Sequence, residues 1–293
     1  MPMPKDIGVI DLMMGIPTSG DNKEIYDFLK PLLMDEQSRK MFSMPAQYMF
    51  KDIPQSGGEE DKVGWVVKQM DAHGIERAMT GIAAGKLDRI EALEAHKDRF
   101  LLSYECNPNL GMEEVRTIRR LKREHGIVAV TCFPAGINPQ VPINDKRLYP
   151  IYSTCVEEDL PFFCCTGVCG PRIPSMCQKT ELIEEVVWFF PELKFVMRHG
   201  AEPWEELAVK LMLKYPNLYY STSAFAPKHY PKAIVDFANK RGTDKVLYAG
   251  YFPMGLSLER IFSELEDVPF RDEVWPKFLR GNALKLFGMD DGE

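Results

Sequence analysis

The feature that most constrains the fold of this chain is an eightfold alternation of short apolar runs with longer helical runs. The short runs show no regular exchange of apolar and polar residues, which is typical of parallel strands buried on both faces. We therefore predict eight strands, at residues 7–11, 76–84, 99–105, 127–133, 161–167, 193–199, 217–223 and 245–251.

The segments between these strands have the lengths and terminal residues of helices. Gly74 and Gly126 stand where a helix is expected to end, and Pro203 stands where one is expected to begin. We predict helices at 62–74, 86–98, 112–126, 145–159, 179–190, 203–215 and 229–242, with further helical material after the last strand to about Phe287.

Eight strand–helix units in 293 residues predict an α/β fold of the (β/α)8 TIM-barrel type. An open, doubly wound sheet is the alternative. We expect one domain over residues 1–293, with a long insertion at 15–60 after the first strand and a C-terminal helical extension. An insertion of this length on a barrel is expected to cap the active-site face or to contact another subunit.

The composition argues against several classes of partner. The formal net charge is −7 and no block of Lys and Arg stands out, so we expect binding neither to nucleic acid nor to a membrane surface. No apolar run approaches the ~18 residues of a membrane helix, and the first residues lack the pattern of a signal peptide. Seven cysteines, an odd number, indicate reduced thiols, and we expect a cytoplasmic protein that acts on a small-molecule substrate.

Barrel enzymes place their chemistry at the C-terminal ends of the strands. His199 is the one histidine of five at such an end, and we predict that it moves a proton. Cys165 either ionises beside His199 and acts as a nucleophile, or only fills space. Glu105 is a candidate general base if it is buried, or a partner for a basic residue such as Arg172.

Other residues near these strand ends are candidates for substrate binding. Arg172 follows the fifth strand, where it either holds a carboxylate through two hydrogen bonds or stays solvated. Thr166 and Met13 are expected to line the pocket, and Tyr251 to donate a hydrogen bond to an oxyanion or to fill the site. Arg198 precedes His199, so strand alternation predicts that it faces the helix layer and forms an ion pair there.

Several motifs in the chain resemble those of the amidohydrolase-related family typified by aminocarboxymuconate-semialdehyde decarboxylase and γ-resorcylate decarboxylase. The sixth predicted strand passes into a helix through the sequence Met-Arg-His-Gly-Ala-Glu-Pro-Trp. Further similar segments follow in the family's order, namely RFLLSYECNPN, KRLYPIYSTCVEEDLPFFCCTG, KVLYAGYFP and GNALKLFGM. The resemblance covers almost the whole chain and implies a TIM barrel that is commonly dimeric, so we expect a homodimer.

The chain departs from the family at the metal site that the resemblance implies. The family holds its metal with a His-x-His pair after strand one, a histidine on strand five and an aspartate on strand eight. Here those positions read Met13 and Gly15, then Cys165, then Tyr251, while His199 keeps the place of the family's acid/base histidine. A thioether, a glycine, a thiol and a phenol are a poor set of ligands for a divalent metal, so we expect no metal or other cofactor.

Two functions remain open. The first is a metal-independent hydrolase or carbon–carbon lyase, decarboxylase-like, that acts on a small carbonyl or carboxylate compound with His199 as acid/base. Lactonases of the same superfamily hydrolyse lactones without metal, although they use an eighth-strand aspartate where this chain has Tyr251. The second is a non-catalytic binding or partner protein with a degenerate metal site. We favour the enzyme, because unpaired polar groups buried in a pocket are costly unless a ligand uses them.

Overall fold

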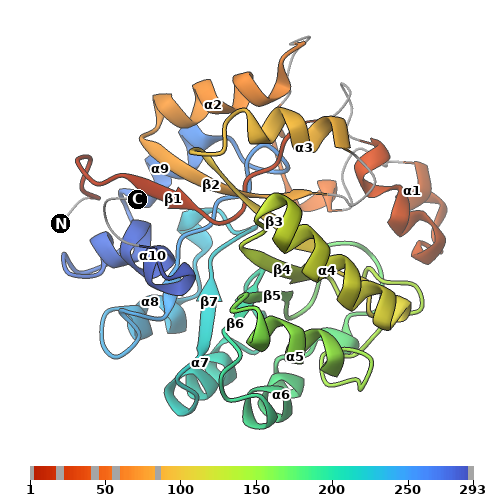
Figure 1. Cartoon of the computed structure of the whole chain (residues 1–293). Coiled ribbons are helices and arrows are strands. Elements are labelled where there is room, and N and C mark those ends of the chain that lie inside the picture. Colours follow the sequence, from red (N-terminus) through yellow and green to blue (C-terminus); the bar gives the residue numbers. More distant parts are fainter. Residues whose placement is uncertain (1–2, 18–22, 41–45, 55–59, 83–86, 290–293) are drawn as a thin grey trace.

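The computed structural model describes residues 3–17, 23–40, 46–54, 60–82 and 87–289. Its eight strands form a single parallel sheet in chain order, which confirms the predicted barrel (Figure 1). The strands are β1 (Val9–Asp11), β2 (Ile75–Ile82), β3 (Phe100–Glu105), β4 (Ala129–Cys132), β5 (Phe162–Cys165), β6 (Phe195–Arg198), β7 (Leu218–Ser221) and β8 (Val246–Leu247).

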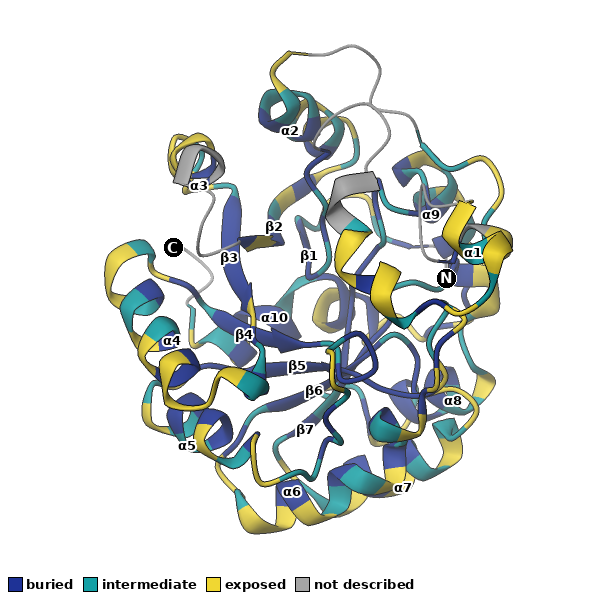
Figure 2. Ribbon diagram, turned by 90° about the vertical axis from the view of Figure 1, so that its right-hand side faces the viewer, coloured by how far each residue is buried: buried dark blue, intermediate teal, exposed yellow. Residues whose placement is uncertain are grey.

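Helices follow the strands on the outside of the sheet, close to the predicted ranges. Their exposed faces point outward, while the strands at the centre are buried (Figure 2). The α-helices are α1 (Glu36–Lys40), α2 (Lys62–Ala72), α3 (Leu87–Glu94), α4 (Met112–His125), α5 (Tyr149–Glu157), α6 (Ile183–Phe189), α7 (Glu205–Lys214), α8 (Lys232–Ala238), α9 (Leu258–Leu265) and α10 (Asn282–Phe287). The 3₁₀ helices are η1 (Lys23–Leu32), η2 (Gln47–Met49), η3 (Pro108–Leu110), η4 (Met176–Gln178), η5 (Thr180–Leu182) and η6 (Pro227–His229), and η7 (Lys277–Gly281) is a π-helix.

Side chains alternate along the strands between two apolar cores. On β6, Phe195 and Met197 belong to the core between the sheet and the helices, whereas Val196 belongs to the smaller core inside the barrel. On β5, Cys164 belongs to the outer core and Phe163 to the inner one. The period of two residues therefore directs every second side chain of these strands toward the barrel axis.

The first and last strands are joined by contacts beyond their ends. The backbone N–H of Leu12 donates to Tyr248 at 3.3 Å, that of Gly15 donates to Phe252 at 2.8 Å, and Met14 forms a parallel bridge with Phe252. These bonds close the barrel between β1 and the short strand β8, and they hold the segment after β1 against the segment after β8.

A buried carboxylate strengthens this closure. Asp11 is fully buried, and its Oδ1 accepts hydrogen bonds of 2.9 Å from the backbone N–H groups of both Met13 and Gly250. Burial raises the pKa of Asp11 to about 7, although the two backbone donors act in the opposite direction. Asp11 thereby ties together the two chain segments that carry Met13 and Tyr251.

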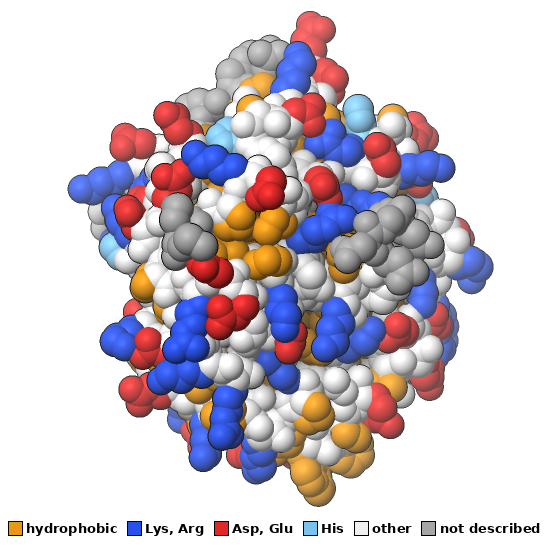
Figure 3. Space-filling model, turned by 90° about the vertical axis from the view of Figure 1, so that its left-hand side faces the viewer, with side chains coloured by type: hydrophobic (Ala, Val, Ile, Leu, Met, Phe, Trp, Pro, Cys, Tyr) orange, Lys and Arg blue, Asp and Glu red, His pale blue; other side chains and the backbone are white. Residues whose placement is uncertain are grey.

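The described parts of the 15–60 insertion lie over the C-terminal ends of the strands. Helix α1 and the 3₁₀ helix η1 stand on the face that Figure 2 turns toward the viewer. The opposite face shows Lys and Arg side chains interleaved with Asp and Glu (Figure 3). In the part of the chain that the structure describes, no helix has both the length and the apolar character needed to cross a bilayer.

The raised pKa of Asp11 predicts a pH-dependent stability. Between about pH 4 and pH 7 the unfolded carboxyl ionises while the folded one stays protonated, so rising pH lowers the free energy of unfolding by about 1.4 kcal/mol for each pH unit. Asp11→Asn keeps an acceptor for the two backbone donors and removes the pH-dependent decrease in the free energy of unfolding. Urea denaturation of both proteins at several pH values measures the effect.

The stability advantage of Asp11→Asn over the wild type is expected to grow across this range and to level off above pH 7. A difference that is independent of pH would show that Asp11 ionises normally in the folded protein.

Candidate active site

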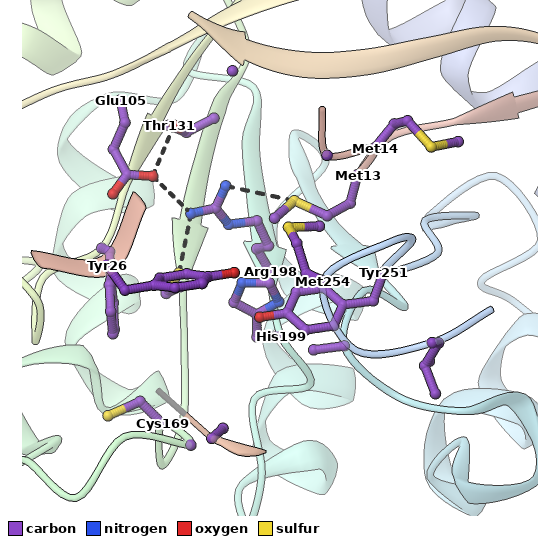
Figure 4. Close-up of a pocket in the computed structure, with 18 of the residues that line it drawn as sticks. Met13, Met14, Tyr26, Glu105, Thr131, Cys169, Arg198, His199, Tyr251 and Met254 are labelled. Carbon is purple, nitrogen blue, oxygen red and sulfur yellow. Dashed lines mark hydrogen bonds and ion pairs between the residues drawn. The ribbon is translucent and has the colours of Figure 1, made fainter. Parts of the chain in front are cut away.

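The strand ends open into a cavity of about 980 Å³ beneath the insertion. Its wall includes six of the seven residues that the sequence nominated, and Figure 4 shows several of them converging on one region. The six are Met13, Glu105, Cys165, Thr166, His199 and Tyr251. These residues come from or follow five strands, which the barrel brings to one place as the fold predicts.

The orientation of Arg198 differs from the prediction. Arg198 points to the same side of β6 as Val196, toward the barrel axis. Its side chain therefore lies inside the barrel mouth rather than in the helix layer. The sequence argument assumed that alternation continues through His199. However, β6 ends at Arg198, and His199 has a φ of +66°, in the left-handed region. This turn breaks the period of two, so both consecutive side chains face the cavity.

The guanidinium of Arg198 lies at the centre of the site and is 5% exposed. Its Nη2 contacts Oε2 of Glu105 at 3.3 Å and donates to Sγ of Cys165 at 3.2 Å, while Nη1 lies 4.0 Å from Sδ of Met13 (Figure 4). Cys165 is also the strand neighbour of Arg198 in the pairing of β5 with β6. The cation is therefore held by one carboxylate oxygen and two sulfur atoms.

His199 is held by Ser223, which follows β7. The Ser223 hydroxyl lies 3.0 Å from Nδ1 of His199 and also accepts the backbone N–H of His199 at 3.2 Å. This leaves Nε2 as the ring nitrogen for a substrate. Burial, followed by the charge of Arg198, lowers the pKa of His199 well below its usual value. The imidazole is therefore neutral at pH 7.

Glu105 is at the rim of the site rather than buried within the barrel. Its side chain is 45% exposed, and it contacts Arg198 and accepts a hydrogen bond of 3.4 Å from the Thr131 hydroxyl. The predicted ion pair with a basic residue exists, but the partner is Arg198 and not Arg172. Glu105 thus acts first as the counter-ion of the buried guanidinium.

Cys165 faces the mouth as predicted, while Cys164 points into the outer core. The expectation that an imidazole would ionise Cys165 does not match its surroundings. Its hydrogen-bond partner is Arg198, and burial raises the pKa of the thiol to about 12 in spite of that positive charge. The thiol therefore stays protonated at neutral pH and contacts the guanidinium as a neutral group.

Aromatic side chains lie beside His199 and Arg198. The Tyr251 ring meets the imidazole edge to face with 5.6 Å between centroids, and Phe50 of the insertion stacks on Tyr251, also at 5.6 Å. Tyr26 reaches from the insertion toward Arg198 (Figure 4). Burial raises the pKa of both phenols, that of Tyr26 to about 12, so each carries a proton that it can donate.

Arg172 lies outside the cavity, contrary to its predicted place in substrate binding. Its Nη1 donates to Gln37 at 2.8 Å and pairs with Asp35 at 3.3 Å, and its guanidinium stacks over the Tyr48 ring. These contacts attach the loop after β5 to the insertion. Arg172 is therefore part of the support of the cap.

The residues present do not fit the metal that the fold family implies. At the family's ligand positions stand a thioether at Met13, a thiol that burial keeps protonated at Cys165, and a phenol at Tyr251. A buried guanidinium occupies the space between two of them, and its positive charge repels a second cation. Across the described residues, no group of three or more His, Cys, Asp or Glu side chains is arranged to hold a metal.

Sequence reasoning missed three important residues. Arg198 was assigned to the outer face of its strand, and Ser223 was not singled out. Tyr26 lies in the insertion, where no strand pattern predicts the position of a side chain. A signal for Arg198 existed, because an arginine inside a run of apolar strand residues is costly to bury without a purpose. No comparable signal marks Ser223 or Tyr26.

Comparison with known proteins identifies relatives of the same architecture. The family model described as Amidohydrolase matches residues 42–289. No curated protein matches the chain. The TIM-barrel protein Bb4693 from Bordetella bronchiseptica is 22% identical, with a TM-score of 0.73 over 96% of this chain and 99% of that one.

Two similar structures contain aromatic acids. A 2,6-dihydroxybenzoate decarboxylase complexed with 2,6-dihydroxybenzoate is 15% identical, with a TM-score of 0.66 over 97% of this chain and all of that one. A 5-carboxyvanillate decarboxylase from Novosphingobium aromaticivorans, complexed with manganese and 4-hydroxy-3-methoxy-5-nitrobenzoic acid, is 16% identical, with a TM-score of 0.67 over 97% of each chain. At these identities the structures demonstrate a common fold.

The electrostatics predict how His199 titrates. In an NMR titration of histidine-labelled protein, the His199 resonance is expected to stay at its neutral position from pH 8 to below pH 6, because burial and Arg198 both oppose protonation. His199→Gln identifies the resonance by its loss. A midpoint at or above the ordinary value of about 6.5 would contradict the described environment.

Proposed function

The chain belongs to the amidohydrolase family, whose barrels carry hydrolases and carboxy-lyases, and from this premise we propose a metal-independent, decarboxylase-like lyase. Its substrate is a small carbonyl or carboxylate compound, and His199 moves the proton. The observation that carries the proposal is the position of a neutral imidazole and a fixed guanidinium in one cavity with protonated phenols.

His199 is suited to proton transfer in both directions. A neutral ring accepts a proton at Nε2, while Ser223 keeps the ring oriented through Nδ1. Because its pKa is low, the protonated ring is a strong acid and gives up the proton readily to carbon. In a decarboxylation, Nε2 first takes a proton from a hydroxyl group of the substrate and then passes this proton to the carbon that bears the carboxylate. The carbon–carbon bond breaks, its electron pair stays on that carbon, and CO2 leaves.

Arg198 and Tyr251 stabilise the negative charge that such a reaction develops. The guanidinium is always charged, and the Tyr251 hydroxyl keeps its proton because burial opposes its ionisation. Fixed donors in a cavity shielded from water stabilise charge more strongly than water does, and they need no reorganisation during the reaction. In this proposal, these two groups supply the stabilisation that the family's metal provides elsewhere.

A hydrolase is the second form of the same proposal. It requires a water molecule from which Nε2 of His199 removes a proton, with Arg198 and Tyr251 next to the developing oxyanion. The protonated Cys165 argues against a covalent route through sulfur. We place decarboxylation first because several barrels of similar structure are decarboxylases of aromatic acids.

A non-catalytic binding protein is the competing proposal, and the replaced ligand positions support it. It predicts that the cavity binds a ligand without changing it. The polar groups gathered around His199 favour the enzyme, because binding alone does not require a neutral imidazole held by a dedicated serine.

Turnover of a panel of hydroxylated benzoates and unsaturated keto acids tests the proposal by CO2 release and by transfer of solvent ¹⁸O into product. The wild type is expected to act on at least one compound at the same rate with and without EDTA. His199→Gln is expected to lower kcat by about 10²–10⁴, the usual contribution of general acid–base catalysis. His125→Gln, on helix α4, serves as the matched control and is expected to keep full activity.

Transfer of ¹⁸O without CO2 release would favour the hydrolase. Activity that disappears with EDTA and returns with manganese would contradict metal independence. Unchanged activity in His199→Gln would contradict the role of His199.

A further inference from the structure

We infer that the Arg198 guanidinium takes the place of the metal ion as the cation of this site, and that Glu105 is a built-in counter-ion that a substrate carboxylate displaces. This inference rests on the proposed function and specifies how the substrate is selected. It assigns the specificity to a residue of β6 that the family's metal positions do not include.

The positive charge of Arg198 lies where the family's metal is expected. The guanidinium nitrogens contact Met13 and Cys165, which stand at two of the positions where the family's metal ligands are expected. The positive charge therefore lies between the strand ends that would otherwise share a metal. The Arg198 side chain thus places a permanent positive charge at the position of the metal, and the residues at the ligand positions around it are poor metal ligands.

The buried guanidinium of Arg198 has too few hydrogen-bond acceptors around it. A guanidinium has five N–H donors, and among the described residues those of Arg198 contact a single oxygen atom, that of Glu105. Nη1 has a thioether at 4.0 Å, and Nε is buried without a hydrogen-bond partner among the residues that the structure describes. A carboxylate with two oxygen atoms is the group that best fills this deficit, since it binds a guanidinium through two parallel hydrogen bonds.

The ion pair between Arg198 and Glu105 is weak. Glu105 reaches Arg198 with a single oxygen at 3.3 Å, longer than the about 2.7–2.9 Å of a strong charge-assisted hydrogen bond. Its side chain is 45% exposed, so water can solvate the carboxylate after it leaves. An incoming carboxylate can therefore exchange with Glu105 while the charge around Arg198 stays balanced.

The other guanidinium in the wall does not compete for the same ligand. Arg260 lines the cavity, but its Nε donates to Glu264 at 2.9 Å, and Lys228 lies at 3.3 Å from the same carboxylate. Arg260 is thus already matched with an acid on its own helix. Arg198 differs from Arg260 because it is buried and its Nε has no hydrogen-bond partner among the described residues.

The remaining wall indicates what the carboxylate is attached to. It includes many aromatic, thioether and aliphatic side chains, and the cavity holds about 980 Å³, so a flat apolar body fits beside the charged end. The residues that form this apolar wall include Tyr26, Met49, Phe50, Phe133, Phe225 and Met254. Naphthalene-2-carboxylate is a suitable probe, and naphthalene-2-carboxamide is its uncharged counterpart of nearly equal shape.

Calorimetric titration of both probes, with EDTA present, tests the inference without relying on turnover. The wild type is expected to bind the carboxylate at least tenfold more tightly than the amide. Arg198→Met, which removes the charge and keeps an apolar stem, is expected to abolish this preference. Glu105→Gln, which removes the competing charge at the rim, is expected to strengthen carboxylate binding several-fold and to leave amide binding unchanged.

Glu105→Gln keeps the inference testable if Arg198→Met does not fold. Equal binding of the two probes to the wild type, or binding of neither at millimolar concentration, would overturn it. So would a preference that survives Arg198→Met, or carboxylate binding that weakens in Glu105→Gln. His199→Gln separates the two proposals, because it is expected to stop turnover and keep the carboxylate preference. If the wild type shows the binding pattern but turns over no compound of the panel, only the proposed function is overturned.

Discussion

The site depends on a positive charge held permanently inside the mouth of a barrel. Burying a guanidinium is unfavourable unless acceptors replace the water that it loses. Arg198 meets this requirement only in part, through Glu105 and two sulfur atoms. The same charge opposes protonation of His199. In our proposal it also disfavours a metal ion beside it and leaves donors available for an anion. These properties follow from one side chain at the end of β6.

The barrel supplies the geometry that this charge needs. Pairing of β5 with β6 places Cys165 beside Arg198, and the contacts between the segments after β1 and β8 bring Met13 and Tyr251 to the same rim. The left-handed turn at His199 then adds a second functional side chain directly after Arg198. The insertion contributes Tyr26 and Phe50 to the wall of the same cavity.

The sequence predicted the architecture because hydrophobic periodicity and strand–helix order are repeated eight times, so errors of a few residues at single boundaries do not change the result. It also predicted that Met13, Cys165, Thr166, His199 and Tyr251 share one cavity, because the C-terminal ends of parallel strands meet at one face. The orientation of Arg198 could not be derived, since it depends on where β6 ends and on one positive φ angle. The place of Arg172 depended on contacts with an insertion that has no periodic pattern.

The most direct test of the central claim is a crystal structure of the protein grown with excess manganese and soaked with 6-bromonaphthalene-2-carboxylate. Anomalous scattering from manganese and from bromine would locate each species independently. The account predicts no manganese peak between Met13, Cys165 and Tyr251, and a carboxylate bound to Arg198 with Glu105 turned away. A manganese ion coordinated at that hub, with Arg198 displaced from it, would contradict the account.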